Sequence, residues 1–198
     1  MDKKILAIGA HFDDIEIGVG GTLIKHSNNG DIIYLVITEW DEHRTGDPNI
    51  RINEQKRALK FLNVPERNLI LFKNDDEIYD IICELDKIGA TTIYTMFEND
   101  THLAHRRASL IGQSVGRKLT TQVIFYNSGT SFDFIPNIFS IIDFETKQDV
   151  LKCFESQINL KAVNIDFIKR RESYWASLIT DKQVYAEGFV IRKMLYNI

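Results

Sequence analysis

The sequence predicts an α/β protein built on a Rossmann-like, doubly wound and mostly parallel sheet. Two observations support this prediction. Short apolar stretches rich in β-branched residues alternate with longer stretches whose apolar residues recur at helical spacing. This alternation continues to about Tyr126 without a linker, a repeat or a low-complexity segment. Strands and helices that alternate in this way form parallel sheets with right-handed crossovers and helices on both faces.

The regular part of the chain is expected to form a five-stranded sheet. The strands are expected at residues 3–10, 31–38, 68–72, 91–96 and 121–127. The intervening helices are expected at residues 20–30, 51–64, 76–88 and 105–119. Asn29-Gly30 and Asn63-Val64-Pro65 are suited to end the first two helices. For a doubly wound sheet of this kind we expect the strand order 3-2-1-4-5.

The remaining residues are less regular. Short edge strands are expected within residues 128–144, a helical region up to about Ser177, and a final strand at residues 184–191. These elements would add C-terminal strands and helices to the sheet. A chain of 198 residues fits one ordinary domain. We therefore expect a single domain that spans residues 1–198.

The composition narrows the class of partner. Hydrophobic residues make up 44% and charged residues 26%, which is typical of a globular protein. The sequence has no stretch of about eighteen apolar residues, and its start does not resemble a cleaved signal, so we expect a soluble, cytoplasmic protein. A net charge of −4 without a basic block argues against a nucleic-acid surface. The expected partner is a small molecule, and the sequence leaves the oligomeric state open, a homo-oligomer included.

The two cysteines limit the kind of metal site that this chain can form. Cys83 and Cys153 lie far apart and form no CxxC pattern. They indicate neither a disulfide framework nor a thiolate zinc site. Any metal would therefore need nitrogen and oxygen ligands.

Histidines and acids gather in two loops of the expected fold. In the order 3-2-1-4-5, strands one and four are neighbours where the order reverses, and ligands bind beyond their carboxyl ends. The loop after the first strand contains His11, Asp13 and Asp14, and the loop after the fourth contains His102 and His105. Histidine and carboxylate ligands suit zinc in a catalytic site that keeps one position open for water. One aspartate would bind the metal and the other would face that water, but the spacing alone does not assign the two roles.

Six motifs in a fixed order carry a family resemblance. They are AHFDDIE (10–16), GGTL (20–23), RINEQKRALKFLNV (51–64), THLAHR (101–106), ESQ (155–157) and AEGF (186–189). The first resembles the Ala-His-Pro-Asp-Asp signature of the LmbE/PIG-L family of zinc-dependent N-deacetylases. The others resemble further landmarks of that family, and together the motifs cover nearly the whole chain.

The resemblance implies roles for individual residues. Asp13 would be the general base, and His102 would stabilise the oxyanion or protonate the departing amine. Arg51 would lie near the substrate. The implied reaction is hydrolysis of an N-acyl group, usually acetyl, from an amino sugar or a sugar conjugate, with proton transfers by a carboxylate and an imidazole. The implied ligands of Zn²⁺, or of another divalent ion such as Fe²⁺, are His11, Asp14 and His105.

Two positions depart from the family pattern. Phe12 replaces the usual proline and leaves the ligands unchanged. Ala104 replaces an aspartate that bacterial members often have between the two histidines. Without that carboxylate, we expect Asp100 or Glu98 to pair with His102, or activity to decline at a lower pH.

Two alternative functions follow from other features. A metal-binding relative with lost or altered catalysis is motivated by Ala104. A nucleotide-binding module would use the glycines of residues 18–21 and Glu39 as a ribose-binding acid. The glycine spacing is not GxGxxG, however, and the acids of the first loop would repel a pyrophosphate.

The remaining polar residues singled out by the sequence are interpreted as structural. We expect His26 to be a solvated helix residue and His43 to belong to a surface loop. Ser156, Gln157 and Glu187 are expected to form structural hydrogen bonds, since nothing in their chemistry requires catalysis.

Overall fold

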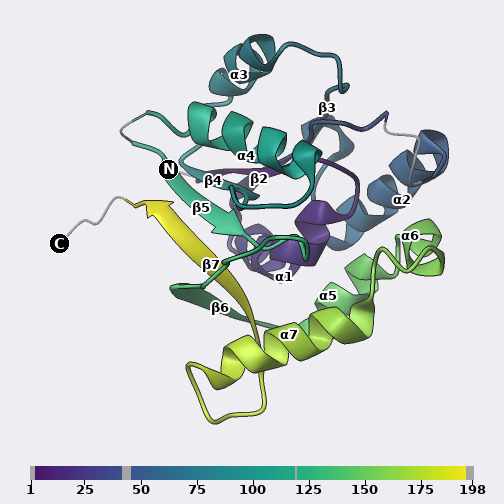
Figure 1. Ribbon diagram of the computed structural model, residues 1–198, viewed down its shortest axis with the longest axis vertical. Helices are drawn as coiled ribbons and strands as arrows, with labels where there is room; N and C mark the ends of the chain where they lie inside the picture. The colour runs from purple at the N-terminus through teal and green to yellow at the C-terminus, as the bar shows by residue number, and fades with distance from the viewer. Residues whose placement is uncertain (1–2, 42–45, 119, 195–198) are drawn as a thin grey trace.

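The computed structural model describes residues 3–41, 46–118 and 120–194, which contain a seven-stranded sheet (Figure 1). The strand order is β3-β2-β1-β4-β5-β7-β6. This confirms the expected order 3-2-1-4-5 and adds two strands from the C-terminal part of the chain. The strands are β1 (Lys4–Gly9), β2 (Ile32–Ile37), β3 (Leu69–Leu71), β4 (Thr92–Met96), β5 (Gln122–Tyr126), β6 (Ile138–Ile142) and β7 (Tyr185–Lys193).

The central strands are parallel and buried on both faces. β1 pairs in parallel with β2 and with β4, whereas β7 runs antiparallel to both β5 and β6. The side chains of Ile5, Leu6 and Ile8 are all 0% exposed, as expected for a strand covered by helices on both sides. Ile8 of β1 lies opposite Thr95 of β4, so the carboxyl ends of these two strands are adjacent.

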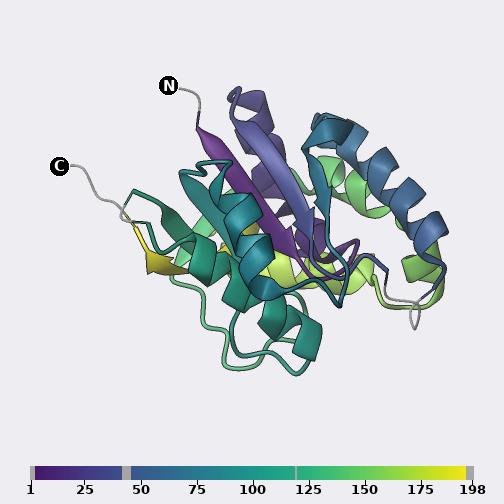
Figure 2. The same cartoon turned by 90° about the horizontal axis from the view of Figure 1, so that it is seen from above.

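Helices cover both faces of the sheet. α3 and α4 lie on one face, and α1 lies on the other together with α5 and α7 (Figure 1). Figure 2 shows α2 beside α5 and α6, which closes the second layer. Within the described residues, no helix combines the length and the apolar character needed to cross a bilayer. The helices are α1 (Asp14–Asn28), α2 (Pro48–Phe61), α3 (Ile78–Asp86), α4 (Leu103–Val115), α5 (Phe144–Leu151), α6 (Glu155–Asn159) and α7 (Ile165–Ser177), with a 3₁₀ turn at Glu66–Asn68.

The first helix begins earlier than predicted. α1 starts at Asp14 and continues through glycines at positions 18, 20 and 21, although glycine disfavours helix interiors. Close packing explains this difference. A Cβ atom at Gly18 would lie 2.1 Å from Tyr126 Cδ2, and one at Gly21 would lie 2.8 Å from Ile142. Gly18 and Gly21 therefore serve helix packing and do not form the turn that a dinucleotide site needs. The nucleotide-binding alternative, which placed these glycines in such a turn, was wrong.

Two further helix starts differ from the predicted ones for local reasons. α2 begins at Pro48, where the Asp47 carboxylate accepts the Asn49 N–H at 2.8 Å and proline occupies the first turn. α4 begins at Leu103, with His102 as its N-cap. The predicted helix ends are confirmed: α2 ends at Phe61, shortly before Asn63, and α1 ends at Asn28, shortly before Gly30.

A buried ionic cluster attaches the C-terminal part of the chain to α1. Glu187 of β7 accepts the backbone N–H groups of Gly21 and Thr22, each at 2.8 Å. Lys147 of α5 donates to Glu187 at 2.6 Å, to Glu172 and to the Ile17 carbonyl at 2.9 Å. The side chains of Lys147, Glu172 and Glu187 are 0% exposed. The structural interpretation of Glu187 is thus confirmed, and this cluster holds the helix that carries Asp14.

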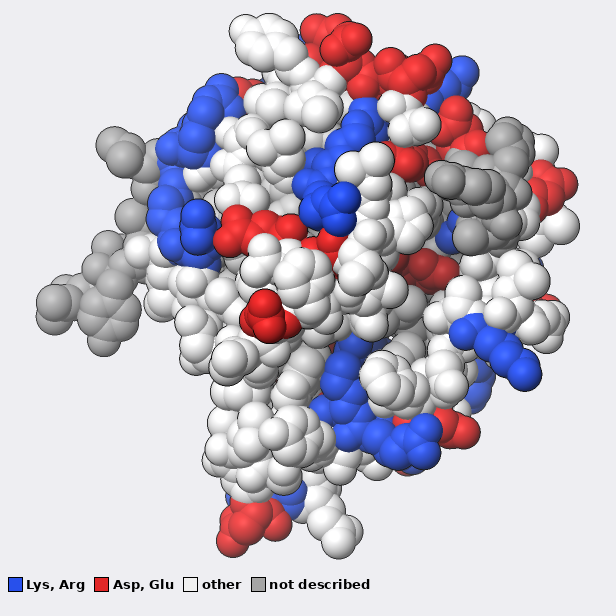
Figure 3. Space-filling view, in the orientation of Figure 1, with Lys and Arg blue, Asp and Glu red and all other residues white. Residues whose placement is uncertain are grey.

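The surface charge is mixed. On the face shown in Figure 3, basic and acidic side chains both occur, and an uncharged area covers β6 and the neighbouring part of β7. β6 is one of the two edge strands of the sheet. Ile141 within β6 is 48% exposed, and Ile135 shortly before it is 80% exposed. This edge therefore carries some of the exposed apolar surface.

Candidate metal centre and active site

Three histidines meet where β1 and β4 end. His11 follows β1, whereas His102 and His105 belong to the start of α4, which follows β4. The ring centroids of His11 and His102 lie 5.0 Å apart, those of His11 and His105 5.5 Å, and those of His102 and His105 4.5 Å. The two loops chosen from the sequence thus come together at the expected edge of the sheet.

Asp14 lies between the two loops. Its Oδ2 accepts the backbone N–H groups of Ala10 at 3.1 Å and of His11 at 2.7 Å. Its Oδ1 lies 3.5 Å from His105 Nε2. Burial alone would raise the pKa of Asp14, but the charges of His105 and His11 and the hydrogen bonds from His11 outweigh burial and lower it. The carboxylate is therefore ionised at neutral pH and available as a ligand.

The donor atoms fit a divalent metal. His11 Nε2 is buried without a hydrogen-bond partner, which is costly unless a ligand satisfies it. The 3.5 Å between Asp14 Oδ1 and His105 Nε2 is close to the roughly 3.3 Å between two tetrahedral zinc ligands with bonds of about 2 Å. One ligand atom from each of His11, His102 and His105 also lies within 4.8 Å of the others. The geometry thus permits either Asp14 or His102 as the third ligand.

Asp13 has a strained backbone and a perturbed carboxyl group. It precedes α1 with φ 98° and ψ −30°, a region that residues other than glycine rarely adopt. Such strain is often found at functional sites. Burial, followed by repulsion from Asp14, holds the pKa of Asp13 well above its usual range, although Arg51 opposes the rise. Asp13 can therefore accept a proton more readily than an exposed aspartate.

Arg51 supports this strained segment from α2. Its Nη2 donates to the Phe12 carbonyl at 2.7 Å and lies 3.7 Å from Asp13 Oδ2. The residue is only 3% exposed. Its guanidinium also lies 5.9 Å from the centre of the Phe12 ring. These contacts fix the loop around Asp13, and a contact of Arg51 with substrate stays a prediction.

His102 is held by the Asp100 carboxylate and by the backbone of Ala104. The backbone N–H of His102 donates to Asp100 Oδ1 at 2.8 Å, and its ring Nδ1 accepts the Ala104 N–H at 3.3 Å. A neutral ring that accepts at Nδ1 carries its proton on Nε2. Burial, together with the charges of His105 and His11, lowers the pKa of His102. His102 is therefore a neutral hydrogen-bond donor at neutral pH.

The expected carboxylate partner of His102 is not found. Among the described residues, no carboxylate is hydrogen-bonded to the His102 ring. Asp100 Oδ1 lies instead 3.2 Å from His105 Nδ1, and Glu98 lies 3.5 Å from Arg192. The first of the two expected alternatives, that either acid pairs with the His102 ring, was wrong, because the start of α4 turns the His105 ring, and only the backbone N–H of His102, toward Asp100. The other alternative, a decline of activity at a lower pH, stays a prediction.

The Asp100 carboxylate accepts several hydrogen bonds that the sequence did not indicate. The residue is 0% exposed and accepts from Ser128 at 2.8 Å, Thr130 at 2.7 Å and Ser131 at 3.0 Å. Thr130 Oγ1 also lies 3.1 Å from His105 Nδ1. These three hydroxyls belong to the SGTS segment after β5. A cluster of hydroxyls in an irregular segment was the only signal of this role in the sequence.

Two buried acids near the site serve the packing of α2. Glu54 accepts the N–H and the hydroxyl of Ser156, each at 2.7 Å, which agrees with a structural role for Ser156. Glu16 accepts from Gln55 at 2.6 Å, and its other oxygen has no partner. Burial raises the pKa of Glu16 to about 7. Glu16 therefore titrates near neutral pH.

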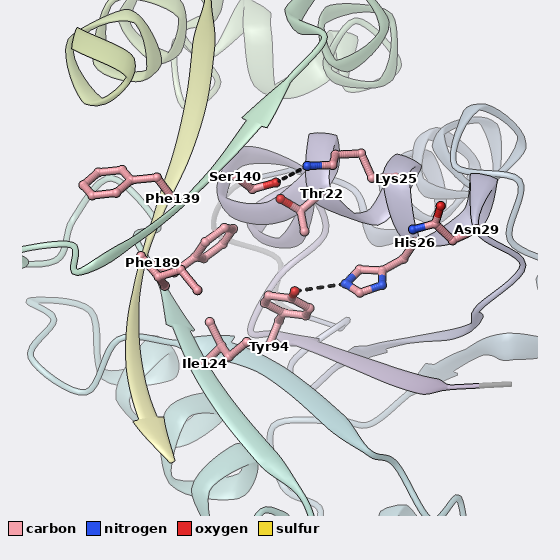
Figure 4. A pocket seen from close by; sticks show the side chains of 10 residues that line it. Thr22, Lys25, His26, Asn29, Tyr94, Ile124, Phe139, Ser140 and Phe189 are labelled. Atoms are coloured by element: carbon pink, nitrogen blue, oxygen red, sulfur yellow. Dashed lines mark hydrogen bonds between the residues drawn. The ribbon is translucent and has the colours of Figure 1, made fainter. Parts of the chain in front are cut away.

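A pocket lies away from the histidines, between α1 and strands β4 to β7. It has a volume of about 210 Å³ and is bordered by Tyr94, Ile124 and Phe189 (Figure 4). His26 on its wall is hydrogen-bonded to Asp31 at 2.7 Å and to Tyr94 at 3.0 Å. The expectation of a solvated His26 was therefore wrong. The prediction for His43 concerns a position outside the described residues.

Comparison with known proteins places this geometry in a family. Residues 6–115 match the family described as PIG-L, GlcNAc-PI de-N-acetylase. The chain is also 30% identical over 153 residues to the Escherichia coli (strain K12) protein named "Uncharacterized deacetylase YaiS". That match covers 71% of this chain and 82% of YaiS.

Solved structures share the fold. The N,N'-diacetylchitobiose deacetylase of Pyrococcus horikoshii superposes with a TM-score of 0.79 at 20% identity, covering 96% of this chain and 83% of that one. GalB of Pseudomonas putida KT2440, a 4-carboxy-2-hydroxymuconate hydratase, superposes with a TM-score of 0.77 at 15% identity, covering 99% of each chain. At these identities the two structures show the fold alone. The family match and the YaiS relative show that the chain belongs to the PIG-L/LmbE family of deacetylases.

Proposed function

We propose that this protein is a metal-dependent N-deacetylase that uses zinc or a similar divalent ion and acts on an N-acyl amino sugar or sugar conjugate. The observation that carries the proposal is the arrangement of His11, Asp14 and His105 beside the raised-pKa carboxyl of Asp13. Family membership supports the deacetylase chemistry. The P. horikoshii enzyme, which acts on diacetylchitobiose by its name, supports a sugar substrate. We also propose that residues 1–198 act as one domain.

The proposed metal ligands are His11, Asp14 and His105. This set uses the unpartnered Nε2 of His11 and the facing atoms of Asp14 and His105. It also leaves His102, which is more exposed than these three, free to face the substrate. A bound divalent ion would polarise the amide carbonyl of the substrate and make a water molecule bound to it more acidic.

The remaining steps belong to the side chains of this protein. Asp13 removes a proton from the attacking water as the new C–O bond forms at the acyl carbon. The Nε2–H of His102 donates to the oxygen on which charge develops. The C–N bond then breaks, and the departing amine takes up the proton that Asp13 received. Arg51 keeps Asp13 in place through the Phe12 carbonyl.

A second candidate is a family member with altered catalysis. Ala104 removes a carboxylate from the site, and the hydratase GalB shows that this fold also accompanies other reactions. Under this alternative the protein would bind metal but release no acetate. Residues around the metal would then serve a different substrate.

Metal analysis combined with an acetate-release assay tests the proposal. We expect one zinc or similar ion per chain, loss of metal and activity together in His11→Ala, and acetate release from N-acetylglucosamine conjugates. Metal binding without acetate release across a panel of amino-sugar conjugates would favour the second candidate. Failure to bind any divalent ion after zinc addition would contradict both.

A further inference from the structure

Asp100 and Thr130 form a small network against one ring nitrogen of His105. Asp100 Oδ1 lies 3.2 Å and Thr130 Oγ1 3.1 Å from His105 Nδ1. The Thr130 hydroxyl donates its own proton to Asp100 Oδ1 at 2.7 Å. Thr130 Oγ1 and the carboxylate therefore both face Nδ1 as acceptors, so Nδ1 must carry a hydrogen.

This arrangement assigns the two nitrogens of His105. With Nδ1 as the donor, Nε2 is the nitrogen available to a metal, and Nε2 is the atom that faces Asp14 Oδ1 at 3.5 Å. Asp100 itself cannot turn away easily, because Ser128 and Ser131 hold its Oδ2 at 2.8 and 3.0 Å. The His105 ring is thus held from one side in a fixed orientation.

We infer that Asp100 and Thr130 are positioning residues that set the orientation and tautomer of His105 for metal binding. The inference rests on the proposed function, since it requires His105 to be a ligand. Partners of this kind on the free nitrogen of a ligating histidine raise its basicity and fix its direction. The segment after β5 therefore takes part in the metal site without contributing a ligand.

Variants of Thr130 test the inference with little disturbance of the fold. Thr130→Val removes the hydroxyl and keeps the shape, whereas Thr130→Ser keeps the hydroxyl. Thr91→Val is the matched control, because it makes the same substitution at a hydroxyl that donates to the Lys4 carbonyl at 3.1 Å, at the end of β4 opposite the histidines. The metal-free full chain of each variant would be titrated with Zn²⁺ in competition with a chromophoric chelator, and the visible spectrum of the Co²⁺ form recorded.

We expect Thr130→Val and Asp100→Asn to weaken Zn²⁺ binding by about 10- to 100-fold and to change the Co²⁺ spectrum. Thr130→Ser should restore both properties, and Thr91→Val should change neither. Equal affinity in Thr130→Val and the parent, or an equal loss in Thr91→Val, would overturn the inference. If Asp100→Asn does not fold, the Thr130 pair decides alone.

His105→Ala separates this inference from the proposed function. If His105→Ala loses the metal while Thr130→Val keeps it, only the role of the network is wrong. If His105→Ala binds Zn²⁺ as tightly as the parent, the proposed ligand set is wrong and the inference falls with it.

Discussion

Asp14 Oδ1 and His105 Nε2 lie 3.5 Å apart, although the two residues belong to the first turns of α1 and α4. Each helix follows a strand, and β1 and β4 are neighbours in the sheet. The contact between a carboxylate and an imidazole therefore follows from the strand order. Both groups are buried, which makes their joint desolvation costly unless a partner such as a cation balances it.

Substitutions of the two neighbouring aspartates should affect different properties, turnover for Asp13 and metal binding for Asp14. Asp13→Asn should keep Zn²⁺ and lose hundreds-fold or more in turnover, within the range of about 10²- to 10⁴-fold that a general base contributes. Asp14→Asn should weaken Zn²⁺ binding itself. Metal content and kcat measured at saturating metal check both. Near-normal turnover of Asp13→Asn would exclude it as the base.

His102 decides between the two ligand sets that the geometry permits. If Asp14 is the third ligand, His102→Asn should keep Zn²⁺ and reduce turnover, because an oxyanion donor is lost. Chelator competition and kcat measured on the same preparation check this. Loss of Zn²⁺ in His102→Asn, with retention in Asp14→Asn, would show the opposite assignment.

If His102, in place of Asp13, protonates the departing amine, Ala104→Asp should shift the pH dependence of activity. A carboxylate near Nδ1 of His102 favours the imidazolium form and raises its pKa, so the ring stays protonated to a higher pH. If His102 acts as an acid, the alkaline limb of kcat/KM moves upward. Leu103→Asp is the control, because it adds the same charge at a side chain that is 72% exposed. An unshifted limb in a folded, metal-loaded Ala104→Asp would remove His102 from the proton transfers.

Glu16→Gln should stabilise the metal-free protein more at pH 8 than at pH 5. Burial raises the pKa of Glu16 from 4.5 to about 7, so the folded state favours the protonated form. The stability that this preference provides is complete below pH 4.5 and is lost as the pH rises through 7. The glutamine amide of the variant does not titrate, so the variant lacks this pH-dependent loss of stability.

The free energy of unfolding of Glu16→Gln relative to the parent should therefore increase by about 2–3 kcal/mol between pH 5 and pH 8. Urea unfolding at both pH values measures it. Glu145→Gln at an exposed position of α5 should show no such trend. A difference that is independent of pH would mean that Glu16 does not titrate in this range.

Lys147→Met should destabilise the fold strongly. It leaves the buried carboxylates of Glu172 and Glu187 without their shared cation, and removing one partner of a buried ion pair costs about 3–5 kcal/mol. The loss should be larger at pH 8 than at pH 5, where carboxylates can be protonated. Lys152→Met, whose partner Asp149 is exposed, should change stability by less than about 1 kcal/mol. Equal effects of the two variants in urea unfolding would contradict the account of the cluster.

The sequence by itself determined the sheet and the place of the site. The alternation of apolar and amphipathic stretches is a local property that repeats along the chain, and it was enough to predict the order 3-2-1-4-5. The strand order then brought His11 and His105 to one edge, because the carboxyl ends of neighbouring parallel strands must meet there. The motifs around these residues identified the family.

Only the tertiary structure decided which groups are partners within that site. α1 has a glycine at position 18 because the Tyr126 ring lies against it and leaves no room for a side chain. Local helix propensity does not encode this contact. Asp100 pairs with the ring of His105 and not with the ring of His102, because the hydroxyls of a segment that follows β5 fix its carboxylate. His26 is held by Tyr94 from another strand. Such pairings depend on contacts between distant parts of the chain. Buried polar groups need hydrogen-bond partners, and the fold decides which partners are within reach.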